Sequence, residues 1–182
     1  MKYRIKDTKT TLKIIGIYQI LGGIFGLCIS GWLLMRTGQI NGPILLIFLV
    51  AIGLYLFSIQ SGNLILQKNR VKRGIIYSMI HHAIQVIAIS TGEYKYEYYS
   101  GAKGTIGFEF TKGFEFNFGI GLSEFNFTIN SDSGELFLFV NIFAIIVLIV
   151  LNDIYKDLFS IKTNDSDLIA EDSLNDSITD NE

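Results

Sequence analysis

Polar side chains gather on one apolar stretch of the chain, and they are the residues best able to carry chemistry. Both histidines, His81 and His82, are neighbours there, with Ser78 and Gln85 close by. Adjacent residues of a helix point about 100° apart, so one metal ion is not held by both imidazoles unless the helix bends. His81 and Gln85 are one turn apart and share a face. The group is interpreted as an intramembrane polar site, either hydrogen-bonded between helices or acting as a metal site or proton relay.

No catalytic or cofactor motif accompanies this polar group. No Asp or Glu lies within the apolar stretches to complete a relay or a metal site, and Cys28 is the only cysteine. A single thiol forms neither an internal disulfide nor a cysteine-rich zinc site. The formal net charge of −2 gives no bulk attraction to nucleic acid. We therefore expect no cofactor, no nucleic-acid partner and no enzymatic activity.

Apolar stretches long enough to cross a bilayer dominate the chain, which has 182 residues, 49% of them hydrophobic. A membrane span needs about 18 or more mostly apolar residues. We expect an α-helical integral membrane protein with four transmembrane helices, at residues 12–35, 43–66, 74–91 and 136–151. The third stretch carries the polar group described above, so a re-entrant or surface helix is its alternative.

Small residues repeat every four positions in the first of these stretches, at Gly22, Gly26 and Ser30. This spacing puts them on one face of a helix and lets a neighbouring helix approach closely. We expect that face to pack within the helix bundle or in a homodimer.

The positions of Lys and Arg predict an orientation in the membrane. The first 13 residues hold five of them and residues 67–73 hold four, whereas residues 92–135 hold three Lys against seven acidic residues. Basic segments stay on the cytoplasmic side. We therefore expect both termini in the cytoplasm, the 92–135 loop outside, and the bacterial inner membrane as the location.

The hydrophobic period changes to strict alternation between residues 94 and 129. Alternation is typical of half-buried strands, so we expect a small antiparallel sheet of three or four strands in the loop between the third and fourth helices. One face of this sheet is aromatic, and it must be covered because so small a sheet is unstable alone. We expect it to pack on the outer helix ends; the lipid interface, a second copy and a ligand are the alternatives. Its candidate binding residues are Phe108, Phe110, Phe114, Phe116 and Phe118.

The two parts of the chain are predicted to be a transmembrane domain, residues 1–158, and a tail, residues 159–182. From residue 163 onward the tail holds seven acidic residues and no Lys or Arg, a composition typical of disorder. Two functions fit this layout. The first is a non-enzymatic multi-pass accessory, assembly or partner-binding subunit, which meets the bilayer and a protein partner or a second copy through the sheet or the tail. The second is a subunit of an oligomeric transporter or channel, with a polar path near the third helix.

Overall fold

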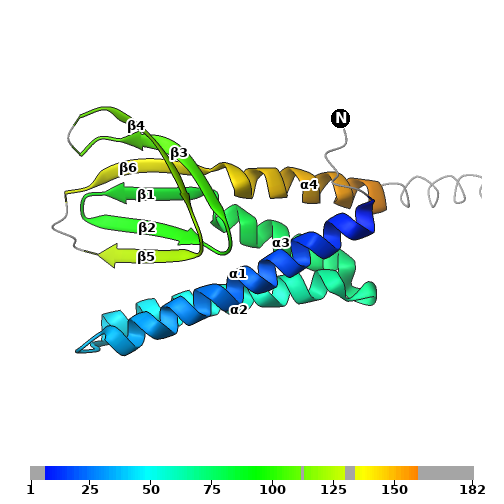
Figure 1. The fold of residues 1–182 in the computed structure, drawn as a ribbon, viewed down its shortest axis with the longest axis horizontal. Coiled ribbons are helices and arrows are strands. Elements are labelled where there is room, and N and C mark those ends of the chain that lie inside the picture. The colour runs from blue at the N-terminus through cyan, green and yellow to red at the C-terminus, as the bar shows by residue number, and fades with distance from the viewer. Residues whose placement is uncertain (1–6, 112, 130–133, 160–182) are drawn as a thin grey trace, which may run out of the picture.

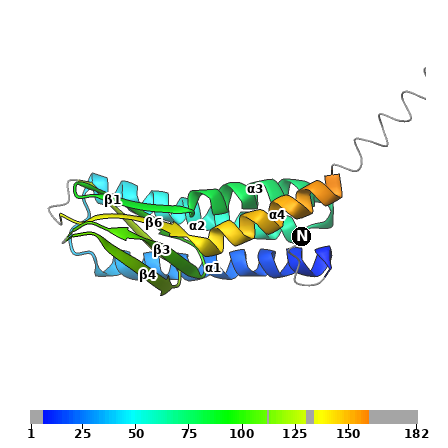
Figure 2. The same cartoon turned by 90° about the horizontal axis from the view of Figure 1, so that it is seen from above.

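Two long antiparallel helices run the length of the molecule in the computed structural model, which describes residues 7–111, 113–129 and 134–159. They are α1 (Thr8–Arg36) and α2 (Gly42–Leu66). The remaining helices lie beside one half of this hairpin, and a β-sheet lies beside the other half (Figures 1 and 2). The sheet is therefore alongside the helices and not stacked on their ends.

Side-chain caps fix where each long helix begins. The Asp7 carboxylate accepts a hydrogen bond from the Thr10 backbone N–H at 2.6 Å, and the Asn41 side chain accepts one from the Ile44 N–H at 3.0 Å. Pro43 follows Asn41 in the first turn of α2, where its missing N–H would have no helical partner anyway. The two helices are therefore bounded by their local sequence.

The other half of the molecule is a four-helix bundle. The short 3-10 helix η1 (Lys68–Arg70) leads from α2 into α3 (Val71–Ile84), and α4 (Ile142–Phe159) returns after the sheet. These helices enclose an apolar cluster formed by Leu12, Ile15, Ile65, Ile75, Val147, Leu151 and Ile154. Most of the stability of the bundle comes from burying this cluster.

The sheet has six strands within the described residues, all paired antiparallel, in the order β4-β3-β6-β1-β2-β5. The strands are β1 (Ile87–Thr91), β2 (Tyr94–Tyr99), β3 (Lys103–Glu109), β4 (Glu115–Gly121), β5 (Glu124–Ile129) and β6 (Leu136–Asn141). β6 lies at the centre and pairs with both β1 and β3. The two edge strands, β4 and β5, are consecutive in the chain and are joined only by Leu122 and Ser123.

The sheet curls around its polar face. Lys103 on β3 bonds Glu97 on β2 at 3.2 Å and also pairs with Glu124 on β5, although β2 and β5 are three and four places from β3 in the sheet. In a flat sheet with strands about 4.8 Å apart, these side chains would be roughly 14 and 19 Å apart. The polar face is therefore concave, and the apolar face, which carries Phe116, Phe118 and Leu138, is convex.

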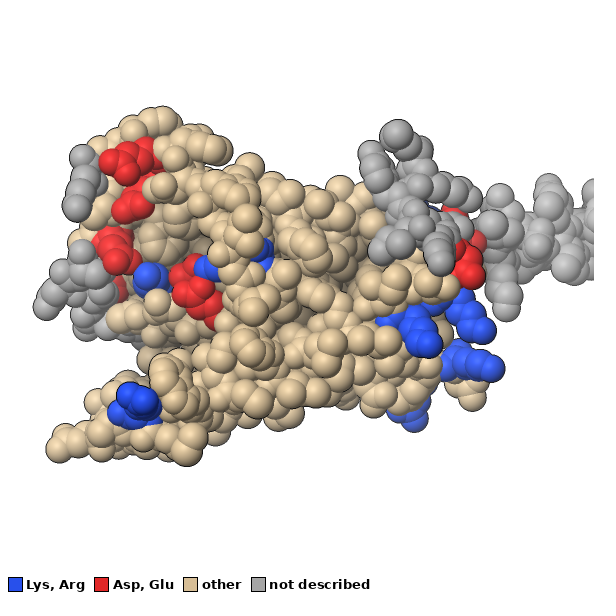
Figure 3. Space-filling model, in the orientation of Figure 1, with Lys and Arg blue, Asp and Glu red and all other residues tan. Residues whose placement is uncertain are grey.

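Charged side chains gather at the two ends of the molecule (Figure 3). At the sheet end, acidic and basic side chains mark the concave face, and Lys and Arg gather where α1 begins and α2 meets η1. The visible surface between the two ends carries no charged colour. The basic end is made by the exposed residues Lys9, Lys13, Lys68, Arg70, Lys72 and Arg73.

The prediction of four transmembrane helices with a sheet of three or four strands is wrong. Of the four α-helices in the described residues, only α1 and α2 are long and apolar enough to cross a membrane. The sheet has six strands and begins directly after α3. The two additional strands are taken from the ends of stretches that the sequence analysis assigned to helices.

A physical reason accounts for each correction. The third stretch, 74–91, is helical only to Ile84, and the β-branched residues that follow form β1, which pairs with β6. The fourth stretch, 136–151, begins as strand β6, and α4 starts only after Asn141. The Asn141 carboxamide oxygen accepts hydrogen bonds from the N–H groups of Phe143 and Ala144, at 3.1 and 3.4 Å, and so caps α4.

The predicted tail, residues 159–182, lies outside the described residues except for Phe159, the last residue of α4.

Candidate functional site

The polar group singled out from the sequence lies at the centre of the molecule, where helices and sheet meet. We call it the polar junction, and it consists of Gln19, Ser58, Ser78, His81, Gln85, Tyr98 and Ser100. All of these side chains are buried. The junction joins α1, α2, α3 and the end of β2.

His81, Gln85 and Tyr98 form one arm of the polar junction. The Tyr98 hydroxyl donates to the Leu54 backbone carbonyl at 3.0 Å and lies 3.1 Å from Nε2 of His81. Since that hydroxyl donates elsewhere, it accepts from His81, and Nε2 carries the proton. Nδ1 of His81 then accepts from the Gln85 side-chain amide at 3.1 Å. Burial raises the pKa of Tyr98, which keeps this phenol protonated as a donor.

The second arm runs from Gln85 through the serines to Gln19. The Gln85 carboxamide oxygen accepts from the Ser100 N–H at 2.7 Å, and the Ser100 hydroxyl donates to that of Ser58 at 2.9 Å. Ser58 donates to the Gln19 backbone carbonyl, and Ser78 donates to the Gln19 side-chain oxygen, both at 2.9 Å. The arm is therefore a continuous set of hydrogen bonds from the sheet to three helices.

His82 points away from this set, as expected for adjacent residues of a helix. Its ring stacks on Tyr18 with 6.3 Å between centroids and 13° between planes. Within the described residues, neither ring nitrogen of His82 has a hydrogen-bond partner. The two histidines thus face different neighbours, and the described residues contain no group of three His, Cys, Asp or Glu that would hold a metal ion.

The polar junction is closed toward the basic end of the molecule. Ile15 and Ile75 lie one turn before Gln19 and Ser78 on α1 and α3, and both belong to the apolar cluster of the four-helix bundle. Buried, hydrogen-bonded polar groups help to fix one arrangement of the elements that carry them, although the Gln19 side-chain nitrogen has no hydrogen-bond partner among the described residues. The geometry therefore fits a structural joint between sheet and bundle.

Gln85→Ala tests this joint and is expected to lower the free energy of unfolding by about 1–3 kcal/mol. The substitution leaves the buried Ser100 N–H and Nδ1 of His81 without their partners. Thermal unfolding in mild detergent, followed by circular dichroism, measures the change. Gln60→Ala on the exposed face of α2 is the matched control and should unfold like the parent protein. Equal behaviour of the two variants would contradict the assigned role of Gln85.

The small residues of α1 lie on its buried face. A Cβ added at Gly22 would lie 2.6 Å from the Gly101 backbone nitrogen, and one at Gly26 would lie 2.1 Å from the Tyr55 ring. Ser30 is buried next to a small cavity that Tyr55 and Phe125 also line. Gly22 therefore allows close approach of the sheet, whereas Gly26 allows close approach of α2.

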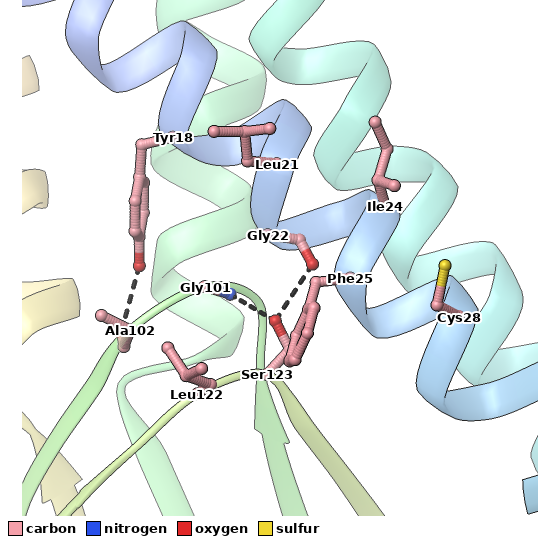
Figure 4. Close-up of a pocket in the computed structure, with 10 residues that line it drawn as sticks. All are labelled: Tyr18, Leu21, Gly22, Ile24, Phe25, Cys28, Gly101, Ala102, Leu122 and Ser123. Carbon is pink, nitrogen blue, oxygen red and sulfur yellow. Dashed lines mark hydrogen bonds between the residues drawn. The ribbon is translucent and has the colours of Figure 1, made fainter. Parts of the chain in front are cut away.

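An apolar groove of about 510 Å³ lies where α1 meets the turns of the sheet (Figure 4). Tyr18 closes one side by donating to the Ala102 carbonyl at 3.0 Å. The Ser123 hydroxyl accepts from the Gly101 N–H at 2.7 Å and donates to the Gly22 carbonyl at 3.0 Å. The remaining residues that line the groove are apolar or small: Leu21, Ile24, Phe25, Cys28 and Leu122. These hydrogen bonds tie the β2–β3 and β4–β5 turns to α1.

The aromatic residues predicted as an outer binding face lie on the convex side of the sheet. We call this surface the aromatic wall, and it consists of Phe108, Phe110, Phe114, Phe116, Phe118 and Ile120 on β3, β4 and the turn between them. The rings of Phe108, Phe110, Phe114 and Phe116 contact one another, and Phe108 and Phe114 stack at 4.9 Å between centroids. Phe116 and Phe118 are 64% and 62% exposed. The wall is thus a contiguous apolar surface without a cover among the described residues.

The two edge strands carry the same four residues, Glu-Phe-Asn-Phe, at 115–118 in β4 and 124–127 in β5. The β5 copy faces the helix hairpin, where Phe125 and Phe127 line cavities together with Ile47 of α2. Among the described residues, the β4 copy faces no other element. The same four residues therefore lie in two different environments, one beside the helices and one without such neighbours.

Sequence reasoning missed some residues of these sites. Tyr98 belongs to the polar junction, and Lys103 organises the concave face, but both lie outside the apolar stretch that holds the histidines. The repeated Glu-Phe-Asn-Phe was readable in the sequence and marks both edges of the sheet. Gln19 does have a sequence signal, because a polar residue in an uncharged apolar stretch predicts a hydrogen bond between helices, and its side-chain oxygen accepts one from Ser78.

No protein-family model, curated protein or solved structure matches this chain.

Proposed function

We propose that the protein is a non-catalytic, partner-binding protein of the bacterial inner membrane, held there by α1 and α2 and meeting its partner through the aromatic wall. The observation that carries the proposal is the Glu-Phe-Asn-Phe segment of β4, where Phe116 and Phe118 are 64% and 62% exposed, whereas in the β5 copy Phe125 is half-buried and Phe127 is 39% exposed beside α2. Contiguous exposed apolar surfaces of this kind mark interaction sites.

The exposure of α1 and α2 supports a membrane setting. In the most apolar 18-residue segment of α2 only 17% is buried, and in that of α1 39% is buried. Core helices of soluble proteins are, in contrast, mostly buried. Residues 14–35 of α1 carry no charge, a length of roughly 33 Å at about 1.5 Å per residue, close to the roughly 30 Å of a hydrocarbon core.

The distribution of charge supports an orientation with the basic end in the cytoplasm. That end holds six exposed Lys and Arg residues, from Lys9 to Arg73, all outside the uncharged stretches of α1 and α2. The sheet then lies toward the outer surface. Because it is beside the second half of α1, where Gly22 meets Gly101, its convex face lies level with the outer leaflet.

Site-specific photo-crosslinking in native membranes tests the proposal. A benzophenone amino acid at Phe116 is expected to give one discrete protein adduct, since this side chain is exposed on the aromatic wall. The same amino acid at Phe125, the equivalent position of the β5 copy, should give no intermolecular adduct because the helices cover it. Adducts with lipid alone at Phe116 would contradict the proposal.

A further inference from the structure

We infer that the partner at the aromatic wall is a second copy of this chain, which pairs antiparallel with β4 along the free edge of the sheet. The inference rests on the proposed function, because it identifies the partner of that same surface. Three observations carry it: the unpaired backbone of β4, the register of β4 against itself, and the apolar cross-strand contacts that pairing would add.

The backbone of β4 argues for a protein strand as its neighbour. Within the part of the chain that the structure describes, β4 pairs with β3 on one side and with no strand on the other, so about half of its N–H and C=O groups point outward without a strand partner. Lipid offers these groups no hydrogen bonds, and open sheet edges do not occur in contact with hydrocarbon. Another strand satisfies them, whereas acyl chains do not.

The sequence of β4 is compatible with self-pairing about a two-fold axis at Phe118. In that register Phe118 faces Phe118 of the second copy, and Phe116 faces Ile120 of the second copy. Glu115 faces Gly121 of the second copy, so no like charges are opposed. Aromatic and aromatic–aliphatic pairs across strands stabilise a sheet. No Lys or Pro, the residues that protect natural edge strands, occurs in β4.

Self-pairing would also bring apolar side chains together across the new strand boundary. Phe116, Phe118 and Ile120 are between 62% and 78% exposed, and each would gain an apolar cross-strand neighbour on the convex face.

Cysteine cross-linking in native membranes tests the inference. Cys28, the only cysteine, is first replaced by serine. Phe118→Cys is then introduced into this Cys28→Ser variant. On the two-fold axis the paired Cβ atoms would be about 4.5–5.5 Å apart, so mild oxidation or a short bis-maleimide is expected to give a covalent dimer. Phe118 is 62% exposed, so the fold does not depend on its ring.

Ile146→Cys in the same background is the matched control, because Ile146 is 52% exposed but lies on α4, away from the sheet edge. It should remain monomeric on the denaturing gel. Phe118→Lys would place two like charges opposite each other, and it is expected to convert the dimer to monomer in light scattering of the detergent-solubilised protein.

A protein adduct at Phe116 of different mass, with no cross-link at Phe118→Cys, would overturn the second copy and leave the proposed function standing. Lipid adducts alone, together with monomeric Phe118→Cys, would remove both.

Discussion

Replacement of Lys103 by Met is expected to lower the free energy of unfolding by about 3–5 kcal/mol, the cost of removing one partner from a buried ion pair. Lys103 serves two carboxylates on the concave face, and the side chains of Lys103 and Glu97 are only 15% and 11% exposed. Burial lowers the pKa of Lys103, but hydrogen bonds and charges from Glu124 and Glu97 outweigh burial and raise it, so the ammonium is charged in the fold. Chemical unfolding in detergent, followed by circular dichroism, gives the free energy.

Two companion variants identify the cause of that loss. Lys103→Met combined with Glu97→Gln should recover most of the stability, because the buried carboxylate is then neutral and the second partner, Glu124, is 42% exposed and can be hydrated. Lys95→Met is the matched control: its partner Glu135 is 44% exposed, and an exposed pair contributes about 0–1 kcal/mol. If both lysine variants lose the same small amount, the ion pairs on the concave face do not stabilise the curled sheet.

Gly22→Ala is expected to cost about 1–3 kcal/mol, the usual penalty for overpacking. The added methyl carbon would lie 2.6 Å from the Gly101 nitrogen and 2.8 Å from its Cα, and backbone atoms cannot move aside as a flexible side chain can. Moving the 100–102 turn also lengthens the Ser123 and Tyr18 hydrogen bonds that attach it to α1. The midpoint of thermal unfolding measures the loss.

Gly31→Ala on the same helix separates this contact from helix propensity. Nothing lies within 4 Å of a Cβ at Gly31, so the substitution should stabilise the helix by about 0.5–1 kcal/mol. Opposite signs for the two glycines are the expected pattern. A stabilising Gly22→Ala would mean that α1 and the sheet turns are not in close contact.

The first two helices could be predicted from sequence because their signals are local. Uncharged length, the Asn41 cap and Pro43 together fix α2, and the predicted stretch 43–66 differs from Gly42–Leu66 by one residue. The alternation of β2 to β5 was equally local. The number of helices long and apolar enough to cross a membrane could not be predicted, since apolar length alone does not distinguish a helix from a helix followed by a strand.

The end of α3 and the start of α4 depend on contacts between residues far apart in sequence. Residues 87–91 become a strand because residues 136–141 pair with them. Nothing in the sequence of either segment indicates that it pairs with the other. The aromatic face of the sheet was expected on the helix ends, but only the β2 and β5 part, such as Tyr98 and Phe125, faces helices. Lys103 on β3 reaches Glu97 on β2 across the curled polar face, a contact without a sequence signal.

The central place of β6 has a consequence for the order in which the fold is made. The described strands before it form two separate groups, β1 with β2 and β5, and β3 with β4, and of the six described strands only β6 pairs with both groups. A growing chain that has reached residue 135 therefore contains two half-sheets with no strand in common. The sheet closes only when residues 136–141 insert between them, a non-local step of the kind that makes folding slow. β6, the last of the described strands to be synthesised, thus joins the two half-sheets. α4 follows β6 in the chain and then packs in the bundle.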